Sequence, residues 1–253
     1  MLQHHLLIAF RNLQRHKGSF FINLIGLSTG LACAFLIFLW VQDERAFDRY
    51  HQKDQQLFQV MEKSSENGNV IVHEGTQGPL AAAMAKDLPE VETAVPVMSL
   101  QKEGIYLQMR SGEKAVRGSG VFAGKEFFTT FSFPLLHGNP QQVLADKNAM
   151  VISASLAESL FGSTANAIGK RIEWELMGEK RTGSVTGVFD HLPANNSMEF
   201  DLALSYELMM TDLAPNFQKW WNEGPSTYLV LRPGTDIEKF NAKIKDFIKP
   251  YFK

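Results

Sequence analysis

The sequence FFINLIGLSTGLACAFLIFLWV, at residues 20–41, contains no Asp, Glu, Lys, Arg or His. As an α-helix rising about 1.5 Å per residue, it reaches about 33 Å, which is enough to cross the hydrocarbon core of a bilayer. A cleaved secretory signal would have a shorter apolar region followed by small residues, whereas here Trp40 precedes the charged sequence QDER at 42–45. The stretch therefore predicts an uncleaved transmembrane helix over residues 20–41, in contact with the lipid bilayer.

The charges that flank this stretch predict its orientation. Residues 1–19 carry Arg11, Arg15 and Lys17 and no acidic residue, whereas the sequence after residue 41 is mixed and net acidic. Because positive charge favours the cytoplasmic side of a membrane helix, we expect the N-terminus in the cytoplasm and residues 42–253 outside it.

Residues 1–19 also carry apolar residues at helical spacing, namely Leu6, Phe10 and Leu13. This pattern predicts a cytoplasmic amphipathic segment that lies in the membrane interface. The alternative is a basic flank that does no more than set the orientation of the membrane helix.

Within the apolar stretch, small residues recur every four positions at Gly26, Gly30 and Ala34. Such a stripe lets a second membrane helix approach closely, so these three residues are the predicted helix-packing site. The alternative is that they reflect the general abundance of small residues in membrane helices.

The composition of the whole chain is that of a globular protein, with 45% hydrophobic and 21% charged residues. The 25 Lys and Arg residues face 27 Asp and Glu residues, so the chain has no basic field for a nucleic acid, and none is expected as a partner. The single cysteine, Cys33, excludes an internal disulfide and a cysteine-rich zinc site.

The order of elements after residue 41 predicts an α+β fold. In residues 42–98, strand patterns at 57–60 and 95–97 flank a helical stretch that opens at Gly78-Pro79, which is a βαβ order. Residues 206–253 return to strand and then helix, with a strand at 227–232 and a helix capped by Thr235. We expect these two segments to share one sheet, with a strand-rich subdomain at 99–205 inserted between them.

The inserted segment contains strand patterns at 105–109, 115–119, 149–152, 172–176 and 185–189. Ser155 and Glu158 match the capping box of a short helix that Gly162 ends. Four aromatic residues are predicted to be core, the alternative being a ligand pocket: Phe127, Phe128, Phe131 and Phe133.

No catalytic, cofactor-binding or metal-binding residue is assigned by any motif. The sequence TANAIGKR at 164–171 lacks both the leading glycine and the final Ser or Thr of a phosphate-binding loop, so the chain is not expected to be an ATPase. Asp190-His191 is the nearest approach to a catalytic pair, and a turn with a solvated histidine explains it better.

Trp220 and Trp221 form a possible contact surface for a partner or for the membrane interface. The alternative is that both indole rings are buried in the core.

In its order of motifs, the chain resembles the N-terminal part of the MacB/FtsX-like ABC transporter permeases. The resemblance runs through nearly the whole chain, and its motifs are specific as an ordered set: AFRNL at 9–13, INLIGL at 22–27, FDRYH at 47–51, EFF at 126–128, FPLLHG at 133–138, VIS at 151–153, AESLFG at 157–162, AIGK at 167–170 and VTGVFD at 185–190.

The resemblance implies a non-catalytic permease subunit of the bacterial inner membrane, with residues 42–253 in the periplasm. Its expected partners are a cytoplasmic ABC ATPase, which would bind the ATP, a second permease copy and a periplasmic adaptor. Movement of the membrane helices would couple ATP hydrolysis to export of a peptide, an antibiotic or a lipoprotein. Because such permeases have at least four membrane helices, the chain is expected to be a fragment, with further helices after Lys253.

Two other function classes remain open from the residues. A single-span sensor or adaptor would bind a ligand outside the cytoplasm and signal inward, but residues 1–19 are too short for an output domain. A membrane-anchored hydrolase would need a catalytic group, which no motif supplies.

Overall fold

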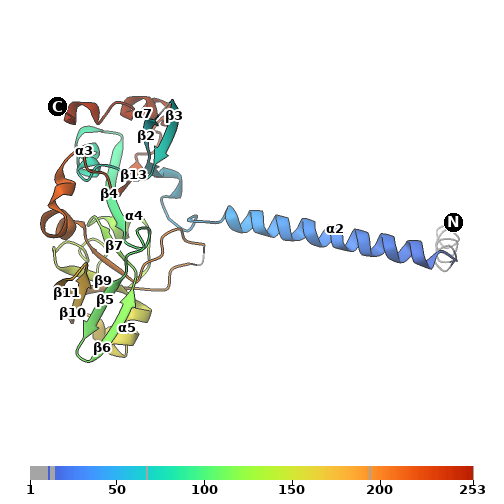
Figure 1. The fold of residues 1–253 in the computed structure, drawn as a ribbon, viewed down its shortest axis with the longest axis horizontal. Helices are drawn as coiled ribbons and strands as arrows, with labels where there is room; N and C mark the ends of the chain where they lie inside the picture. Colours follow the sequence, from blue (N-terminus) through green and yellow to red (C-terminus); the bar gives the residue numbers. More distant parts are fainter. Residues whose placement is uncertain (1–10, 12–14, 67, 194, 253) are drawn as a thin grey trace. The chain divides into compact units, whose positions relative to one another are not determined.

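The computed structural model of the protein describes residues 11, 15–66, 68–193 and 195–252 (Figure 1). These residues belong to two compact units, Met1–Phe47 and Asp48–Lys253.

The main element of the first unit is helix α2, Lys17–Glu44, which has 28 residues and contains the whole predicted span. An 18-residue window within it has a mean hydropathy of 2.3, and every side chain of the helix is exposed. In the part of the chain that the structure describes, α2 is the one helix long and apolar enough to cross a membrane. The predicted apolar helix is therefore confirmed, whereas Leu6, Phe10 and Leu13 of the predicted amphipathic segment lie outside the described residues.

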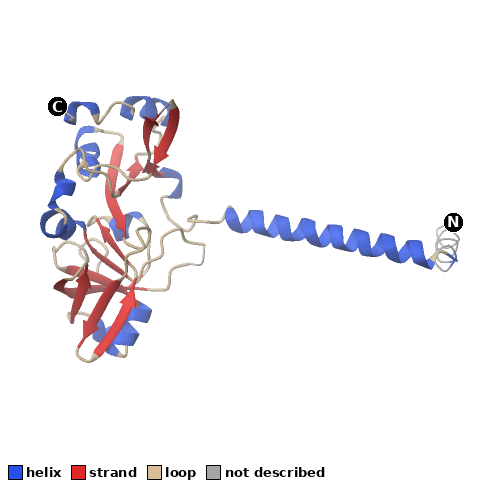
Figure 2. Cartoon of the chain, viewed as in Figure 1, coloured by secondary structure: helices blue, strands red, loops and turns tan. Residues whose placement is uncertain are grey.

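The second unit is built on one large sheet. Its strands follow the order β1-β13-β4-β7-β12-β9-β11-β10-β5-β6, and β8 pairs with β11. The strand bounds are β1 Leu57–Val60, β4 Val91–Ser99, β5 Leu107–Ser111, β6 Lys114–Gly118, β7 Gly120–Ala123, β8 Leu135–His137, β9 Ala149–Ser153, β10 Arg171–Leu176, β11 Glu179–Phe189, β12 Leu202–Ser205 and β13 Ser226–Leu231. Figure 2 shows this sheet as the body of the unit, with the helices around it.

Short helices complete the second unit. They are α3 Leu80–Asp87, α4 Phe127–Thr130, α5 Ala154–Phe161, α6 Tyr206–Leu208 and α7 Ile237–Ile244, with single turns η1 Asp54–Gln56, η2 Ala165–Ala167, η3 Met209–Leu213, η4 Pro215–Gln218 and η5 Lys249–Tyr251.

The first and last segments of the second unit share one sheet, as predicted. Strand β13 pairs antiparallel with β1 on one side and with β4 on the other, so β1 and β4 run parallel with the last strand of the chain between them. Leu80 and Met84 of α3 are buried against this sheet with Phe240 of α7. Figure 1 shows α3, α7 and β13 gathered at one end of the unit.

A separate hairpin follows β1 and was not predicted. Its strands are β2 Glu62–Glu66 and β3 Asn69–His73, which form a two-stranded sheet of their own. The hairpin lies between the first strand and the helix of the predicted βαβ order.

The middle segment is strand-rich, as predicted, and mostly antiparallel, with two parallel pairs, β12 with β7 and β11 with β9. Strand β6 lies at the end of the sheet order and β7 lies fourth, yet Ser119 alone separates them in the chain. The sheet must therefore curl back on itself, and it encloses a core that contains Phe122, Trp174 and Ile152.

The four predicted core phenylalanines are confirmed as core. Phe127, Phe128, Phe131 and Phe133 are each at most 3% exposed, and they pack with Phe200 in a second cluster. The ligand-pocket alternative for these rings does not hold.

Two predicted helix caps are wrong by one or two residues. Ser153, not Ser155, is the N-cap of α5, because β9 leads directly into this helix and Ser153 is its last extended residue. The Oγ of Ser153 accepts from the amide of Leu156 at 3.2 Å. Asp236, not Thr235, caps α7, because the Thr235 hydroxyl already donates to the carbonyl of Arg232 in the preceding turn. Gly162 ends α5 at φ 81°, as predicted.

The predicted boundaries at 98/99 and 205/206 stay predictions. Strand β4 crosses the first boundary and pairs with both β13 and β7, so the sheet is continuous between the two predicted subdomains.

Candidate functional site

The site begins with the five residues that follow the first unit, residues 48–52, which we call the connector. Asp48 has a left-handed backbone, with φ 58°. Its amide donates to the carbonyl of Asn195 at 2.9 Å, and its Oδ1 accepts from the amide of Ser197 at 2.9 Å. The backbone amide and the carboxylate of Asp48 are therefore both hydrogen-bonded to a segment about 150 residues further along the chain.

Tyr50 makes a third contact with the same segment. Its hydroxyl donates to Oδ1 of Asn196 at 2.8 Å. Asn196 is 7% exposed, and its side-chain Nδ2 donates to the carbonyl of Met198. Burial and the nearby Asp48 charge raise the pKa of the Tyr50 hydroxyl far above its ordinary value of 10.0, so it stays a hydrogen-bond donor at physiological pH.

His51 anchors the connector in the aromatic core. It is 5% exposed, and its ring centroid lies 4.2 Å from that of Tyr50, 5.5 Å from Phe131 and 5.6 Å from Phe133. Burial lowers the pKa of His51 below 6.5, against the opposing effects of Asp48, of a hydrogen bond to the backbone of Phe131 and of Asp54. Its Nδ1 is buried without a partner, so the neutral ring is the form that fits this place.

The segment held by the connector, residues 195–201, is the last part of the connection from β11 to β12 and is called the roof loop below. Ser197, Met198 and Glu199 of this loop line one side of a cleft of about 80 Å³. The other side is formed by β4, β7, β13 and the turn after β4, with these lining residues: Val97, Met98, Ser99, Gln101, Lys102, Glu103, Val121, Gly224, Ser226 and Tyr228. The cleft therefore lies where the first, middle and last segments of the unit meet.

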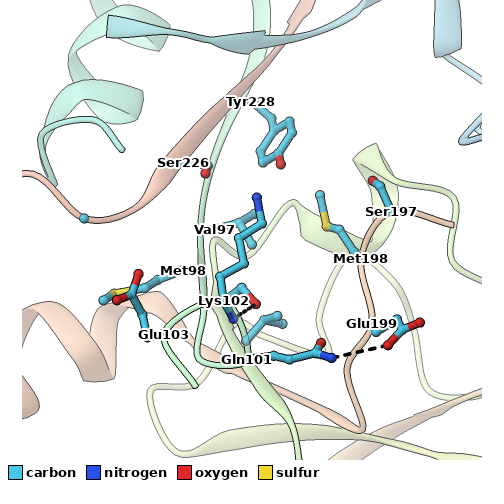
Figure 3. Close-up of a pocket in the computed structure, with 13 residues that line it drawn as sticks. Val97, Met98, Gln101, Lys102, Glu103, Ser197, Met198, Glu199, Ser226 and Tyr228 are labelled. Atoms are coloured by element: carbon cyan, nitrogen blue, oxygen red, sulfur yellow. Dashed lines mark hydrogen bonds between the residues drawn. The ribbon is translucent and has the colours of Figure 1, made fainter. Parts of the chain in front are cut away.

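The cleft is lined by both apolar and charged side chains. Figure 3 shows Met198 and Lys102 below Tyr228, and Gln101 reaching across to Glu199, whose carboxylate accepts from it at 3.3 Å. Lys102 forms an ion pair with Glu74, and burial, with the Glu74 and Asp48 charges, raises the pKa of Tyr228 to about 12. Among the described residues that line this cleft, no nucleophile lies beside a base. The mixture of apolar and charged side chains suits binding of a partner surface that presents both kinds of group.

A second pocket, of about 330 Å³, shares Glu199 of the roof loop with the cleft. Glu199 and Asp201 of the loop line it together with Ser119 and Asp190. Asp201 Oδ2 accepts from the amide and the hydroxyl of Ser119 at 2.7 Å and 3.1 Å, which fixes the C-terminal end of the loop to the curl between β6 and β7.

His191 is solvated, as predicted, but the predicted turn is wrong, because the structure has no turn at Asp190 and His191. The Asp190 carboxylate accepts from the backbone amide of His191 at 2.8 Å, and the His191 side chain is exposed. In the described ranges, no group of three or more His, Cys, Asp or Glu residues is placed to hold a metal ion.

The predicted tryptophan pair divides between core and surface. Trp220 stacks on Tyr251 at 3.9 Å and packs against the third core cluster, whereas Trp221 is 71% exposed with Lys219 near its ring. The alternative that both rings are buried fails for Trp221, and its contact role stays a prediction.

The predicted membrane-helix residues lie on α2, apart from this site in the sequence. A Cβ added at Gly26 or Gly30 would meet nothing within 4 Å, and Ala34 is exposed, so the stripe is open in the single chain. Arg11, Arg15 and Lys17 are exposed too. Helix packing and orientation stay predictions.

The connector and the roof loop were not predicted as a site. The sequence FDRYH at 47–51 drew attention only through the family resemblance, and nothing local in it indicates a partner about 150 residues away. An aspartate at positive φ is a known preference of turns, but it becomes visible only in the structure.

Comparison with known proteins finds one matching family model for this chain. The family model of the MacB-like periplasmic core domain matches residues 20–247. A comparison with curated proteins finds no match in sequence.

Solved structures are similar in fold. A domain from Porphyromonas gingivalis, described as part of a permease protein, aligns with a TM-score of 0.66 and 23% identity over 79% of this chain and 86% of its own. The periplasmic region of MacB from Actinobacillus actinomycetemcomitans aligns with a TM-score of 0.55 and 14% identity over 81% and 86%.

The extracellular domain of the noncanonic ABC-type transporter YknZ from Gram-positive bacteria aligns with a TM-score of 0.54 and 13% identity over 77% of this chain and 95% of its own. Because an apolar helix precedes the sheet domain and the family model spans most of the chain, the protein belongs to the family of the MacB-like periplasmic core domain.

Proposed function

We propose that this chain is part of the permease subunit of an ABC transporter. The observation that carries the proposal is the order of its parts, in which an apolar helix of 28 residues leads directly into a MacB-like periplasmic core domain. The solved structures with this fold include regions of MacB and of an ABC-type transporter, which supports the same role here.

In this proposal the chain itself catalyses no reaction. A cytoplasmic ABC ATPase binds and hydrolyses ATP, and the permease transmits the resulting movement through its membrane helices to the extracytoplasmic domain. A second permease copy packs along the stripe of Gly26, Gly30 and Ala34, and a periplasmic adaptor contacts the domain. The cargo is a peptide, an antibiotic or a lipoprotein.

The proposed location is the bacterial inner membrane, with the N-terminus in the cytoplasm and residues 42–253 outside it. The basic residues Arg11, Arg15 and Lys17 support this orientation, because they precede α2 or occupy its first residue and no acidic residue accompanies them.

The test is purification of the full-length gene product from its native membrane, with identification of the proteins that remain bound. We expect an ABC ATPase to co-purify, and its rate of ATP hydrolysis to change when the permease is removed. A full-length product that carries no ATPase and no effect on ATP hydrolysis would contradict the permease role and favour a single-span sensor.

A further inference from the structure

We propose that the connector, residues 48–52, is a clamp that passes displacement of the membrane helix to the roof loop, residues 195–201, and thereby changes the width of the cleft. The inference rests on the proposed function for its purpose, since a permease needs a route from its membrane helix to the extracytoplasmic domain. Asp48 and Tyr50 are the positioning residues of this route.

The first step of the argument is covalent. Helix α2 ends at Glu44, and only the turn of residues 45–47 separates it from Asp48. A pull or tilt of the helix therefore reaches Asp48 with little slack, because each residue spans at most about 3.6 Å.

The second step is the set of hydrogen bonds that hold the roof loop. Three consecutive loop residues are each bonded to the connector: the Asn195 carbonyl accepts from the Asp48 amide, the Asn196 side chain accepts from the Tyr50 hydroxyl, and the Ser197 amide donates to the Asp48 carboxylate. A bond to a charged acceptor is stronger than one between neutral groups, so the contact of Ser197 with Asp48 is the strongest of the three.

The third step is that the roof loop lines both the cleft and the second pocket. Ser197, Met198 and Glu199 line the cleft, and Glu199 and Asp201 line the second pocket. The far end of the loop is fixed, since Asp201 accepts from Ser119 and its carbonyl accepts from the amide of Ser153 at 2.7 Å. Between these two attachments lie residues 198–200, of which Phe200 is buried in the aromatic cluster, so a displacement of the clamp would reach the cleft through Met198 and Glu199.

The connector is also firmly seated on the aromatic core. His51 is 5% exposed among aromatic rings, and the amide of Gln52 donates to Oγ of Ser132 at 3.1 Å. In sequence, Asp48 and Tyr50 thus lie between α2 and the two residues, His51 and Gln52, that attach the connector to the core.

The test measures deuterium uptake of the roof loop in the full-length protein, reconstituted in nanodiscs of short-chain or long-chain phosphatidylcholine (dimyristoleoyl or dierucoyl). A change in bilayer thickness tilts or shifts a membrane helix without any ATPase. We expect uptake by residues 195–201 to differ by about twofold or more between the two bilayers in the wild-type protein.

Two variants remove the clamp. Asp48→Gly keeps the left-handed backbone but loses the acceptor of Ser197, and Tyr50→Phe loses the donor to Asn196. In the doubly substituted protein we expect roof-loop exchange to be roughly tenfold faster in both bilayers, and no longer to depend on bilayer thickness.

One matched control keeps a hydrogen-bond acceptor at position 48, and the other removes a tyrosine hydroxyl outside the connector. Asp48→Asn retains a side-chain oxygen that accepts from Ser197, and Tyr106→Phe removes a hydroxyl from an exposed tyrosine outside the connector. Both should keep the wild-type dependence on bilayer thickness.

Two results would overturn the clamp. One is the same roof-loop exchange in thin and thick bilayers for the wild type, and the other is an unchanged thickness dependence in the Asp48→Gly, Tyr50→Phe protein. Failure to find an ATPase would count against the proposed function but would leave this measurement unaffected, so the two proposals fail separately.

Discussion

Replacing Phe133 by alanine tests whether the aromatic core supports the connector. Phe133 is 3% exposed, and its ring lies within 6.3 Å, between centroids, of six other rings. These neighbours come from the connector, from α4 and its C-terminal flank, and from the roof loop: Tyr50, His51, Phe127, Phe128, Phe131 and Phe200. The side chain is therefore the common contact of three segments that are distant in sequence.

The expected loss follows from burial and cavity formation. Truncating a fully buried phenylalanine to alanine removes about 3–5 kcal/mol of unfolding free energy, because apolar contacts are lost and the cavity closes only in part. For a unit of this size, about 1 kcal/mol shifts the unfolding temperature by about 2–4 °C. We therefore expect Phe133→Ala to lower the unfolding temperature by about 10 °C.

The assay is thermal unfolding of the full chain in detergent, followed by intrinsic tryptophan fluorescence. Trp174 is 2% exposed in the first core cluster, so its emission reports on the sheet as a whole. The matched control is Phe252→Ala, which removes the same ring from a place where it is 52% exposed, and should cost less than about 1 kcal/mol. A Phe133→Ala protein that unfolds within about 2 °C of the wild type would refute the reasoning.

Three further predictions follow from single residues. Gly78→Ala should destabilise the second unit by about 3 kcal/mol or more, because a Cβ there would lie 2.0 Å from the backbone oxygen of Phe217, as measured by thermal unfolding. His51 has its pKa lowered by burial, so the folded chain binds fewer protons than the unfolded chain below about pH 6.5, and stability should fall as pH drops from about 7.5 to about 5.5; His51→Phe should reduce this dependence. Gly26→Leu with Gly30→Leu should impair assembly of the full-length permease, measured by co-purification of differently tagged copies, without changing the unfolding temperature of the second unit.

The controls for these predictions are already present in the chain. Gly75→Ala should be nearly neutral, because its Cβ would meet its nearest neighbours at 3.7 Å, and a loss equal to that of Gly78→Ala would contradict the steric argument. Burial raises the pKa of Glu62, which opposes the effect of His51, but Glu62 is common to both proteins compared. Equal pH dependence in His51→Phe and wild type would count against the role of His51, and normal assembly of the glycine variant would remove the stripe as a contact.

Elements whose pattern is local were predictable from the sequence. The alternation around Trp174 gave β10, and the uncharged residues 20–41 gave the apolar helix, because in each case burial or bilayer exposure is decided by neighbouring positions. Helix caps were less predictable, because Ser153 and Ser155 are chemically equal candidates and only the backbone of the preceding strand selects one.

The site was less predictable than the fold. Contacts of Asp48 with Ser197 depend on the whole sheet being folded, since the strands between them bring the two segments together. The tryptophan pair gives the same lesson, because adjacent side chains point in different directions: the turn after η4 directs Trp220 to Tyr251 and leaves Trp221 exposed.

The central claim is that ATP hydrolysis in the cytoplasm changes the conformation of residues 48–253. The most direct measurement is deuterium uptake of these residues in the full-length permease with its co-purified ATPase, in nanodiscs, with ATP held in a non-hydrolysing state and then with ADP. The account predicts a change in uptake that is greatest at the connector and the roof loop. Identical uptake throughout residues 48–253 in the two nucleotide states would contradict it.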